Sequence, residues 1–297
     1  MRKIMGESLD SGLGLLEELV KGRAKERRVF TTQALCFLMI GSYLVRRWNL
    51  QSGLHALLES GAKKFLGNCK RVREGNHSRN TSGISQARQQ LSVQALLDVW
   101  NELLCQLKGR ERLWEGRLVK TIDGSTELLK PLNSLRAEYP PAKNQFGESA
   151  YPIMMLTVCH DALSGVAEDY ELGAMNGEER TWELEQSKCI MSRMSPETII
   201  LADRGHGMFQ MVRHARLCQL DALYRLTDVR AKMLLGRQIQ PGLDEEVTWR
   251  PSKAELKSHP DWRADEQVPG RIITRTIIRD NKSFILVLFT TLGKKYS

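Results

Sequence analysis

Two short runs of apolar and β-branched residues, each leading to an aspartate, constrain the fold of this chain more than any other feature. Residues 120–126 read Lys-Thr-Ile-Asp-Gly-Ser-Thr, and residues 198–205 read Thr-Ile-Ile-Leu-Ala-Asp-Arg-Gly. Such runs, bounded by glycine, are typical of buried strands. A carboxylate at the end of a buried strand is costly unless a cation meets it. The two runs therefore predict a sheet that brings Asp123 and Asp203 together around a cation.

The first part of the chain, residues 1–115, is predicted to be a helical domain. Apolar residues recur at helical spacing from Leu9 to about Leu118. Gly109, with Lys108 and Arg110 beside it, is typical of a helix C-terminus. The polar and basic stretch 67–83 is predicted to be an exposed loop. The clearest helical patterns cover residues 32–48, 52–65 and 91–107.

This helical part also carries the positive charge of the chain. Residues 1–120 hold 21 Lys and Arg against 11 Asp and Glu, a net charge of +10. The remaining residues hold 23 and 24, a net charge of −1, which together give the +9 of the whole chain. Because basic excess confined to one part favours contact with a polyanion, we expect this part to bind nucleic acid.

The second part alternates strands and helices, which predicts an α/β layer with a mixed sheet. Strands are expected at 118–122, 151–160, 165–172, 198–202 and 222–227, and helices at 180–194 and 206–217. Beyond Arg230 the pattern is strand and loop with no strong helix, its best strands being 248–250, 271–279 and 283–291. We therefore divide this part into a core, residues 116–230, and a β-rich insertion, residues 231–297.

Each aspartate also has a simpler interpretation. Asp123-Gly124 is compatible with a turn, and Asp203 with the N-cap of a helix opening at His206. Taken together in a basic chain, they favour a metal pair, because a divalent cation relieves the repulsion between neighbouring carboxylates. Oxygen ligands select Mg²⁺ or Mn²⁺ rather than zinc. The chemistry expected of such a site is two-metal phosphoryl transfer.

Candidate DNA contacts lie on both parts of the chain. Arg204 directly follows the second aspartate, where it fits a phosphate or a neighbouring carboxylate. A polar helix beginning near Ser85 supplies Arg and Gln, which suit base edges. The candidate DNA-binding residues are Lys70, Arg71, Arg73, Arg79, Arg88 and Arg204.

Several other features point to ordinary structural roles. The six cysteines form no Cys-x-x-Cys pair, which argues against a zinc ribbon or a redox motif. Asp161 is expected in a hairpin turn. The tryptophans Trp182, Trp249 and Trp262 are expected to pack in the core or in the β-rich insertion, with stacking on a flipped base as the alternative for the last two. No signal peptide is visible, so we expect a cytoplasmic protein that associates with the bacterial nucleoid when bound to DNA.

At these residues the chain resembles bacterial insertion-sequence transposases of the DDE class, in the insertion-sequence-four group. The resemblance covers nearly the whole chain in a consistent order. Its pieces are Thr-Ile-Asp-Gly-Ser at 121–125, Ser-Ala-Tyr-Pro at 149–152, Leu-Ala-Asp-Arg-Gly at 201–205, the basic helical segment 84–93 and Leu-Phe-Thr-Thr-Leu at 288–292.

The resemblance implies a ribonuclease-H-like catalytic domain with Asp123 on the first strand and Asp203 after the fourth. It also implies Mg²⁺ (or Mn²⁺) as cofactor, and cleavage and strand transfer at insertion-sequence ends. The implied partners are terminal inverted repeats, target DNA and further copies of the chain.

The family's third carboxylate is a glutamate in a helix beyond the β-rich insertion. No glutamate follows Glu266 here, so no residue of this chain takes that role. The expectation is a truncated chain without the final catalytic helix and with impaired activity. Two alternatives stay open: a non-catalytic DNA-binding transposase remnant or inhibitor, and an unrelated two-carboxylate nuclease or phosphatase.

Overall fold

The computed structural model describes residues 29–44, 49–59, 65–76, 80–107, 113–280 and 282–296. The chain divides into two compact units, residues 1–109 and 110–297. The helical pattern predicted for residues 9–28 lies outside the described residues. No helix among the described residues is long and apolar enough to cross a membrane. All six cysteines are free thiols.

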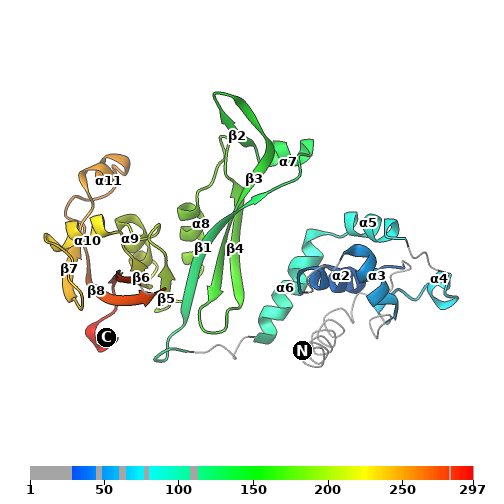
Figure 1. Ribbon diagram of the computed structural model, residues 1–297, viewed down its shortest axis with the longest axis horizontal. Helices are drawn as coiled ribbons and strands as arrows, with labels where there is room; N and C mark the ends of the chain where they lie inside the picture. The colour runs from blue at the N-terminus through cyan, green and yellow to red at the C-terminus, as the bar shows by residue number, and fades with distance from the viewer. Residues whose placement is uncertain are drawn as a thin grey trace. The chain divides into compact units, whose positions relative to one another are not determined.

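The first unit is helical, as predicted. Its described helices are α2 (Thr32–Leu44), α3 (Leu50–Glu59), α4 (Lys70–Arg73), α5 (Ser82–Gln89) and α6 (Val93–Leu107) (Figure 1). Phe37, Leu54 and Leu57 are buried in its core with Phe65, and Ile84 of α5 joins them. The polarity of residues 67–83 predicts a loop. The structure differs, because α4 forms one exposed helical turn within this stretch.

The second unit is built on one mixed sheet. Its described strands are β1 (Val119–Leu128), β2 (Pro141–Asn144), β3 (Gly147–Asp161), β4 (Ala167–Ala174), β5 (Ile199–Ala202), β6 (Asp221–Arg225), β7 (Asp244–Trp249), β8 (Val268–Arg279) and β9 (Lys282–Thr290). Their order is β2-β3-β1-β5-β6-β9-β8-β7, with β4 also paired to β3. β1, β5 and β6 run parallel, whereas β3 is antiparallel to both β1 and β4. This arrangement confirms the predicted α/β class and is consistent with a ribonuclease-H-like sheet.

Helices cover one face of that sheet and enclose the main core. α8 (Glu183–Met191) packs on β1, β3 and β4, and α9 (Phe209–Leu217) packs on β6 and β8 (Figure 1). Ile122, Ile200 and Tyr224 of the strands are buried against Met191 and Phe209 of these helices. The opposite face holds a smaller cluster in which Val119, Ile199 and Leu292 are buried. Alternate residues of β1 and β5 thus face the two sides.

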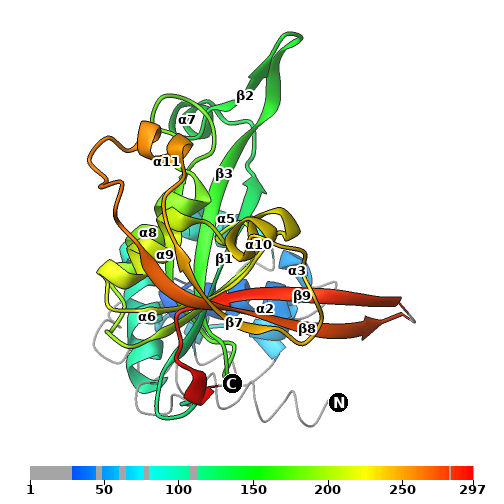
Figure 2. The same cartoon turned by 90° about the vertical axis from the view of Figure 1, so that its left-hand side faces the viewer.

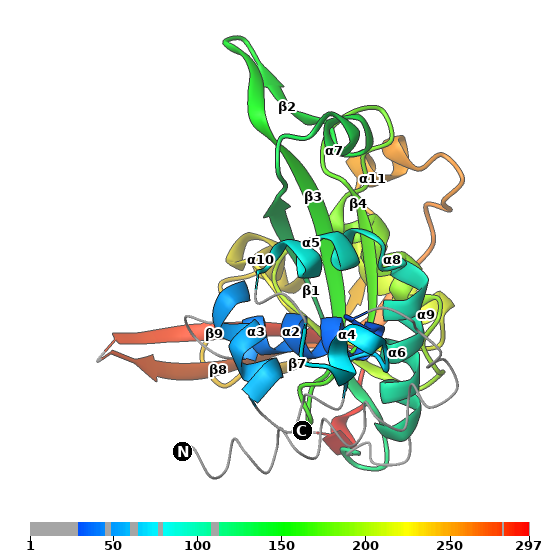
Figure 3. The same ribbon diagram turned by 90° about the vertical axis from the view of Figure 1, so that its right-hand side faces the viewer.

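The residues beyond 230 extend the same sheet. β9 pairs with β6, and β8 and β9 continue as a long ribbon that extends from the body of the unit (Figures 2 and 3). The expectation of no strong helix beyond Arg230 is wrong in two places, because α10 (Asp228–Leu235) continues past Arg230 and a second helix follows β7. α11 (Lys253–Ser258) forms, and its six residues are too few to show an apolar stripe. A capping box between Ser252 and Glu255 starts it, which is a local signal that the sequence carried.

Three further helices complete the unit: α7 (Asn133–Glu138), α10 (Asp228–Leu235) and the 3₁₀ turn η2 (Lys294–Tyr296). α7 and β2 occupy a segment for which the sequence predicted no element. Thr227 caps α10 through its side chain, and Gly236 ends it in the left-handed conformation that glycine tolerates.

Gly270 allows β8 to pack closely against β9, and we expect Gly270→Ala to destabilise the second unit. A methyl group there would overlap the ring of Phe289, which is fully buried, and would lie 2.7 Å from the carbonyl oxygen of Thr290. Overpacking of this kind costs about 1–3 kcal/mol. Urea unfolding measures the loss. Gly293→Ala is the matched control because a Cβ at Gly293 meets nothing within 4 Å; equal stability of the two variants would contradict the prediction.

Candidate active site

The pairing of β1 with β5 brings the two predicted aspartates to the same level of neighbouring parallel strands. Thr121 of β1 is in register with Leu201 of β5. Asp123 and Asp203 each lie two residues further along in the same direction. The two aspartates therefore stand at matching positions of adjacent chain segments. They are 80 residues apart in the sequence, and strand pairing brings the segments that carry them side by side.

Asp123 lies within β1 rather than at its end. The strand continues to Leu128 because Gly124 to Leu128 pair with Thr157 to Ile153 of β3. The interpretation of Asp123-Gly124 as a turn is therefore wrong. Ile122 faces the core under α8 and α9, so Asp123 points from the opposite side of the strand.

Asp203 opens a loop between β5 and α9 and does not cap the helix. α9 begins at Phe209 with Met208 as its N-cap residue, so the predicted helix start at His206 is wrong by three residues. The Asp203 Oδ1 accepts a hydrogen bond from the backbone N–H of Gly205 at 2.7 Å and faces Nδ1 of His206 at 3.3 Å. Partial burial raises the pKa of Asp203, but the contacts with His206 and Gly205 outweigh it and lower the pKa overall. The carboxylate is thus held ionised.

Both aspartates are solvent-exposed; the Asp203 side chain keeps 59% of its surface accessible. The cost of burying a carboxylate therefore does not apply to them. Their significance is that they occupy matching positions of two adjacent strands.

His206 is the buried centre of a network that the sequence did not reveal. It is 1% exposed, and its Nε2 lies 2.9 Å from Oγ of Ser187 on α8. The same Nε2 is 3.9 Å from Oε1 of Glu183, the first residue of α8. Glu183 Oε1 in turn accepts a 2.9 Å hydrogen bond from the backbone N–H of Gly124. Neither Glu183 nor Ser187 stands near the aspartates in the sequence, so only the fold assembles them.

The donor chemistry of the aspartate pair fits a hard cation. Mg²⁺ keeps several water ligands and is bound through one or two carboxylates. Two exposed aspartates are therefore ligands of the type and number that it takes. Among the described residues, no group of three or more His, Cys, Asp and Glu side chains is arranged to hold a metal ion. The site is therefore a carboxylate pair open to solvent.

The candidate DNA-binding residues that the structure describes are exposed. Lys70, Arg71 and Arg73 lie on α4, and Arg88 lies in the last turn of α5. Lys70 approaches Glu74 at 3.9 Å with 80% of its side chain exposed, so this pair leaves the ammonium group available. Arg79 lies outside the described residues. Exposed cations on short helices are suited to phosphate contact.

Arg204 is also exposed, and its position is fixed by α10. Its backbone carbonyl accepts a hydrogen bond from Nη1 of Arg230 at 3.1 Å. This contact ties the loop that carries Asp203 to the helix after β6. The Arg204 side chain is left to face solvent beside the aspartate.

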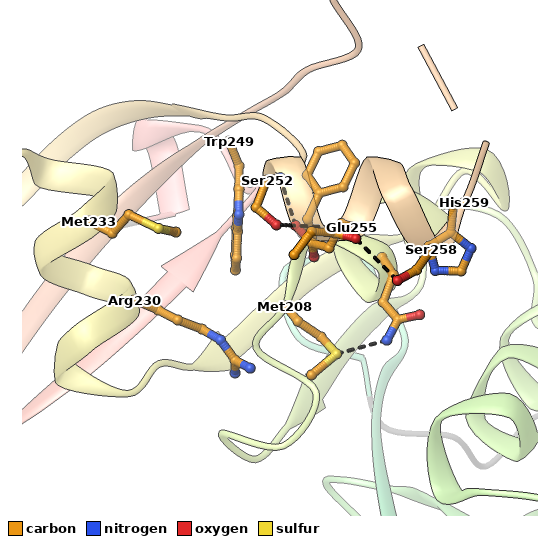
Figure 4. A pocket seen from close by; sticks show the side chains of 11 residues that line it. Met208, Arg230, Met233, Trp249, Ser252, Glu255, Ser258 and His259 are labelled. Atoms are coloured by element: carbon orange, nitrogen blue, oxygen red, sulfur yellow. Dashed lines mark hydrogen bonds between the residues drawn. The ribbon is translucent and has the colours of Figure 1, made fainter. Parts of the chain in front are cut away.

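A pocket of about 490 Å³ lies beside the start of α9, and neither aspartate lines it (Figure 4). Its lining includes Met208, Arg230, Met233, Trp249 and His259. Trp249 is 2% exposed and packs edge-on against Phe289, with 4.9 Å between the ring centroids. The core role predicted for this tryptophan is confirmed, and so little of its ring is accessible that it offers no face for a stacked base.

The other two tryptophans differ from each other. Trp262 is partly buried against the core, as expected, and stacks on His259 with centroids 4.0 Å apart. Trp182 is 54% exposed, so the prediction of a core role for it is wrong. Trp182 lies at the N-cap of α8, and the Arg180 guanidinium lies 5.5 Å from its ring centroid.

No family model and no curated relative match this chain. Among solved structures, it is similar to a piggyBac transposase in a synaptic complex with hairpin DNA, at 11% identity and a TM-score of 0.39, over 96% of this chain and 58% of that one. It is also similar to an endonuclease V from Bacillus subtilis, at 12% identity and a TM-score of 0.25, over 67% of this chain and 76% of that one. The chain thus spans less than two thirds of the transposase. Both likenesses are too distant to assign an activity.

Proposed function

We propose that this chain is a DNA transposase that cleaves and joins DNA strands at insertion-sequence ends in a metal-dependent reaction. The observation that carries the proposal is the register of β1 and β5, which sets Asp123 and Asp203 at one edge of a ribonuclease-H-like sheet. The sequence resemblance to insertion-sequence transposases at both aspartates supports the same function.

In this proposal Asp123 and Asp203 would hold Mg²⁺ or Mn²⁺. Such ions activate the attacking oxygen and stabilise the leaving oxygen of an in-line displacement at phosphorus. The chain's own groups prepare the site for them. His206 and the N–H of Gly205 hold the Asp203 carboxylate in place, and the ladder between β1 and β3 holds the backbone of Asp123.

The basic first unit would supply DNA affinity. Neutralising phosphates with Lys and Arg provides essentially all of non-specific binding, and the excess charge of this chain lies in residues 1–120. The partners proposed are terminal inverted repeats, target DNA and further copies of the chain.

The test is strand cleavage of a labelled duplex carrying the DNA that flanks the chain's own coding sequence, with Mg²⁺, Mn²⁺ or a chelator. Metal-dependent cleavage followed by strand joining supports the proposal. If the folded chain binds the duplex but cleaves it with neither ion, the proposal of a transposase reaction fails.

One observation favours a second candidate, a DNA-binding protein that occupies element ends without cleaving them. No third acidic or imidazole group joins the aspartate pair to form a metal-binding cluster within the described residues. This candidate predicts binding of the same duplex with no cleavage product at any metal concentration. The cleavage assay therefore separates the two functions.

Replacing Lys70, Arg71 and Arg73 together by glutamine is expected to weaken DNA binding and its dependence on salt. Each phosphate contact contributes a slope of about 0.9 to the plot of log binding constant against log salt concentration, so the slope should fall by up to about 3. Fluorescence anisotropy of a labelled duplex between low and high salt measures it.

The matched control replaces three exposed lysines of the second unit, Lys143, Lys253 and Lys257, by glutamine, which removes the same charge. An equal loss of slope in both triple variants would show that total charge, rather than α4, determines binding.

A further inference from the structure

We propose that Glu183 and His206 are positioning residues that set the spacing between the Asp123 and Asp203 carboxylates. This inference rests on the proposed function, because the spacing matters only if the two aspartates share a cation. It concerns α8, an element to which neither the sequence nor the resemblance gave a role at the site.

First, the Glu183 carboxylate lies against the edge of β1 where β5 has ended. β5 pairs with β1 only through Thr121 and ends at Ala202, whereas β1 continues to Leu128. Beyond Thr121, therefore, the edge of β1 that faces β5 has lost its partner strand. The Gly124 N–H donates to Oε1 of Glu183 at 2.9 Å. A side-chain oxygen thus satisfies the backbone N–H of Gly124, directly after Asp123. If β5 were longer, one of its backbone carbonyl groups would accept that hydrogen bond instead.

The second step is the link from Glu183 to the other aspartate. The Nε2 of His206 lies 3.9 Å from Glu183 Oε1 and 2.9 Å from Oγ of Ser187. On the other side of the ring, Nδ1 lies 3.3 Å from Oδ1 of Asp203. The imidazole is 1% exposed, so its orientation is fixed by packing as well as by these contacts. The chain of contacts from Gly124 through Glu183 and His206 to Asp203 spans the gap between the two strands.

The third step is the fit of Gly124. A Cβ at this position would lie 2.6 Å from both Cγ and Cδ of Glu183, so any larger residue would displace that side chain. Glycine here is required by the approach of Glu183. The Asp123-Gly124 pair therefore does not form the turn that the sequence suggested. Its glycine leaves room for the Glu183 carboxylate of α8 to reach β1 beside Asp123.

A positioning role makes a prediction that a ligand or structural role does not. Groups that orient metal ligands typically change metal affinity 10–100-fold when removed. Glu183→Ala and Gly124→Ala are each expected to weaken Mn²⁺ binding by about that factor, with DNA affinity unchanged. Glu183→Gln keeps an acceptor oxygen for the Gly124 N–H and should stay within about threefold of the wild-type chain. In the Glu183→Ala background, Gly124→Ala should cost little more, because it has no side chain left to displace.

The measurement is Mn²⁺ affinity of the full chain, from the electron paramagnetic resonance signal of free Mn²⁺, with circular dichroism to confirm folding. Glu185→Ala is the matched control, since Glu185 is an exposed acid in the same first turn of α8. His206→Ala should weaken binding as Glu183→Ala does.

Each alternative outcome is distinct. If Glu183→Ala binds Mn²⁺ as tightly as the wild type, the positioning role is excluded. If Glu183→Gln is as damaging as Glu183→Ala, the negative charge matters rather than the acceptor, and the positioning role is again excluded. If the wild-type chain shows no Mn²⁺ binding that depends on Asp123 and Asp203, the proposed function itself fails, and this inference fails with it.

Discussion

Asp203→Ala should abolish the stabilisation of this chain by Mn²⁺ and lower the rate of DNA strand cleavage by roughly 10²-fold or more. The physical reason is that, in the proposed function, both aspartates would hold the cation, so either one alone would give it half of its protein ligands. A ligand that binds only the folded state at 100 times its dissociation constant stabilises a protein by about 2.7 kcal/mol. Thermal unfolding with and without Mn²⁺ measures this increment without requiring any catalytic turnover. Asp123→Ala should behave in the same way.

In the absence of metal Asp123→Ala should leave stability unchanged or improve it, whereas Asp203→Ala should lower it modestly, because it removes the acceptor of the Gly205 N–H and the contact with His206. Both carboxylates are exposed, and two like charges at one edge repel each other when no cation lies between them. Loss of function without loss of stability is typical of residues placed for chemistry. Asp261→Ala, at an exposed aspartate of the same unit, is the control and should keep the full response to Mn²⁺. A metal response that survives both active-site substitutions would show that the cation binds elsewhere.

The two strands that carry the aspartates could be predicted from the sequence because the signal for a buried parallel strand is local. Residues 198–202 are apolar or β-branched, and their strand ends where the sequence turns polar at Asp203. Asp123 was found by the same pattern, but the extent of its strand was not. Gly124 to Leu128 form strand only because β3 pairs with them, and no property of those residues by themselves predicts that pairing.

The network behind the aspartates could not be predicted, because it depends on contacts between distant segments. His206 follows Asp203 closely in sequence, and a polar residue there is equally compatible with a helix start. Its burial, and its contacts with Ser187 and Glu183, follow from the packing of α8 on the sheet. Glu183 is one of two acids in the first turn of a helix, where acidic residues are common for reasons of the helix dipole alone.

A different acidic residue of this chain, Asp161, is buried at the end of a strand and does require a cation. Asp161 ends β3, is 1% exposed and lies 3.2 Å from Nζ of Lys120 on β1, which also contacts Glu168 at 2.6 Å. Oδ1 of Asp161 accepts hydrogen bonds from the backbone N–H groups of Leu163 and Ser164, as expected of a turn residue. The sequence interpretation of Asp161 was therefore correct but incomplete.

Lys120→Met is expected to destabilise the second unit by about 3–5 kcal/mol at neutral pH, because it leaves the Asp161 carboxylate buried without its cation. Burial lowers the pKa of Lys120, but the contacts with Glu168 and Asp161 outweigh it and raise the pKa overall. For Asp161, burial raises the pKa, and the hydrogen bonds from Ser164 and Lys120 more than reverse this. Both groups are therefore charged in the folded chain across the neutral range. Urea unfolding of the variant and the wild type measures the difference.

The pH dependence of this loss of stability follows from the raised pKa of Lys120 and the lowered pKa of Asp161. The stability that Lys120 contributes is fully present below its unfolded pKa, about 10.4, and is lost as pH rises through the raised folded value. The stability that Asp161 contributes is present above its unfolded pKa, about 3.9, and is lost as pH falls through the lowered folded value. The cost of Lys120→Met should thus be constant from about pH 5 to 9 and shrink in acid, where Asp161 becomes neutral. Lys130→Met, at an exposed lysine just beyond β1, should change stability by less than about 0.5 kcal/mol. If Lys120→Met and Lys130→Met have the same free energy of unfolding, the buried Lys120–Asp161 pair makes no net contribution to stability.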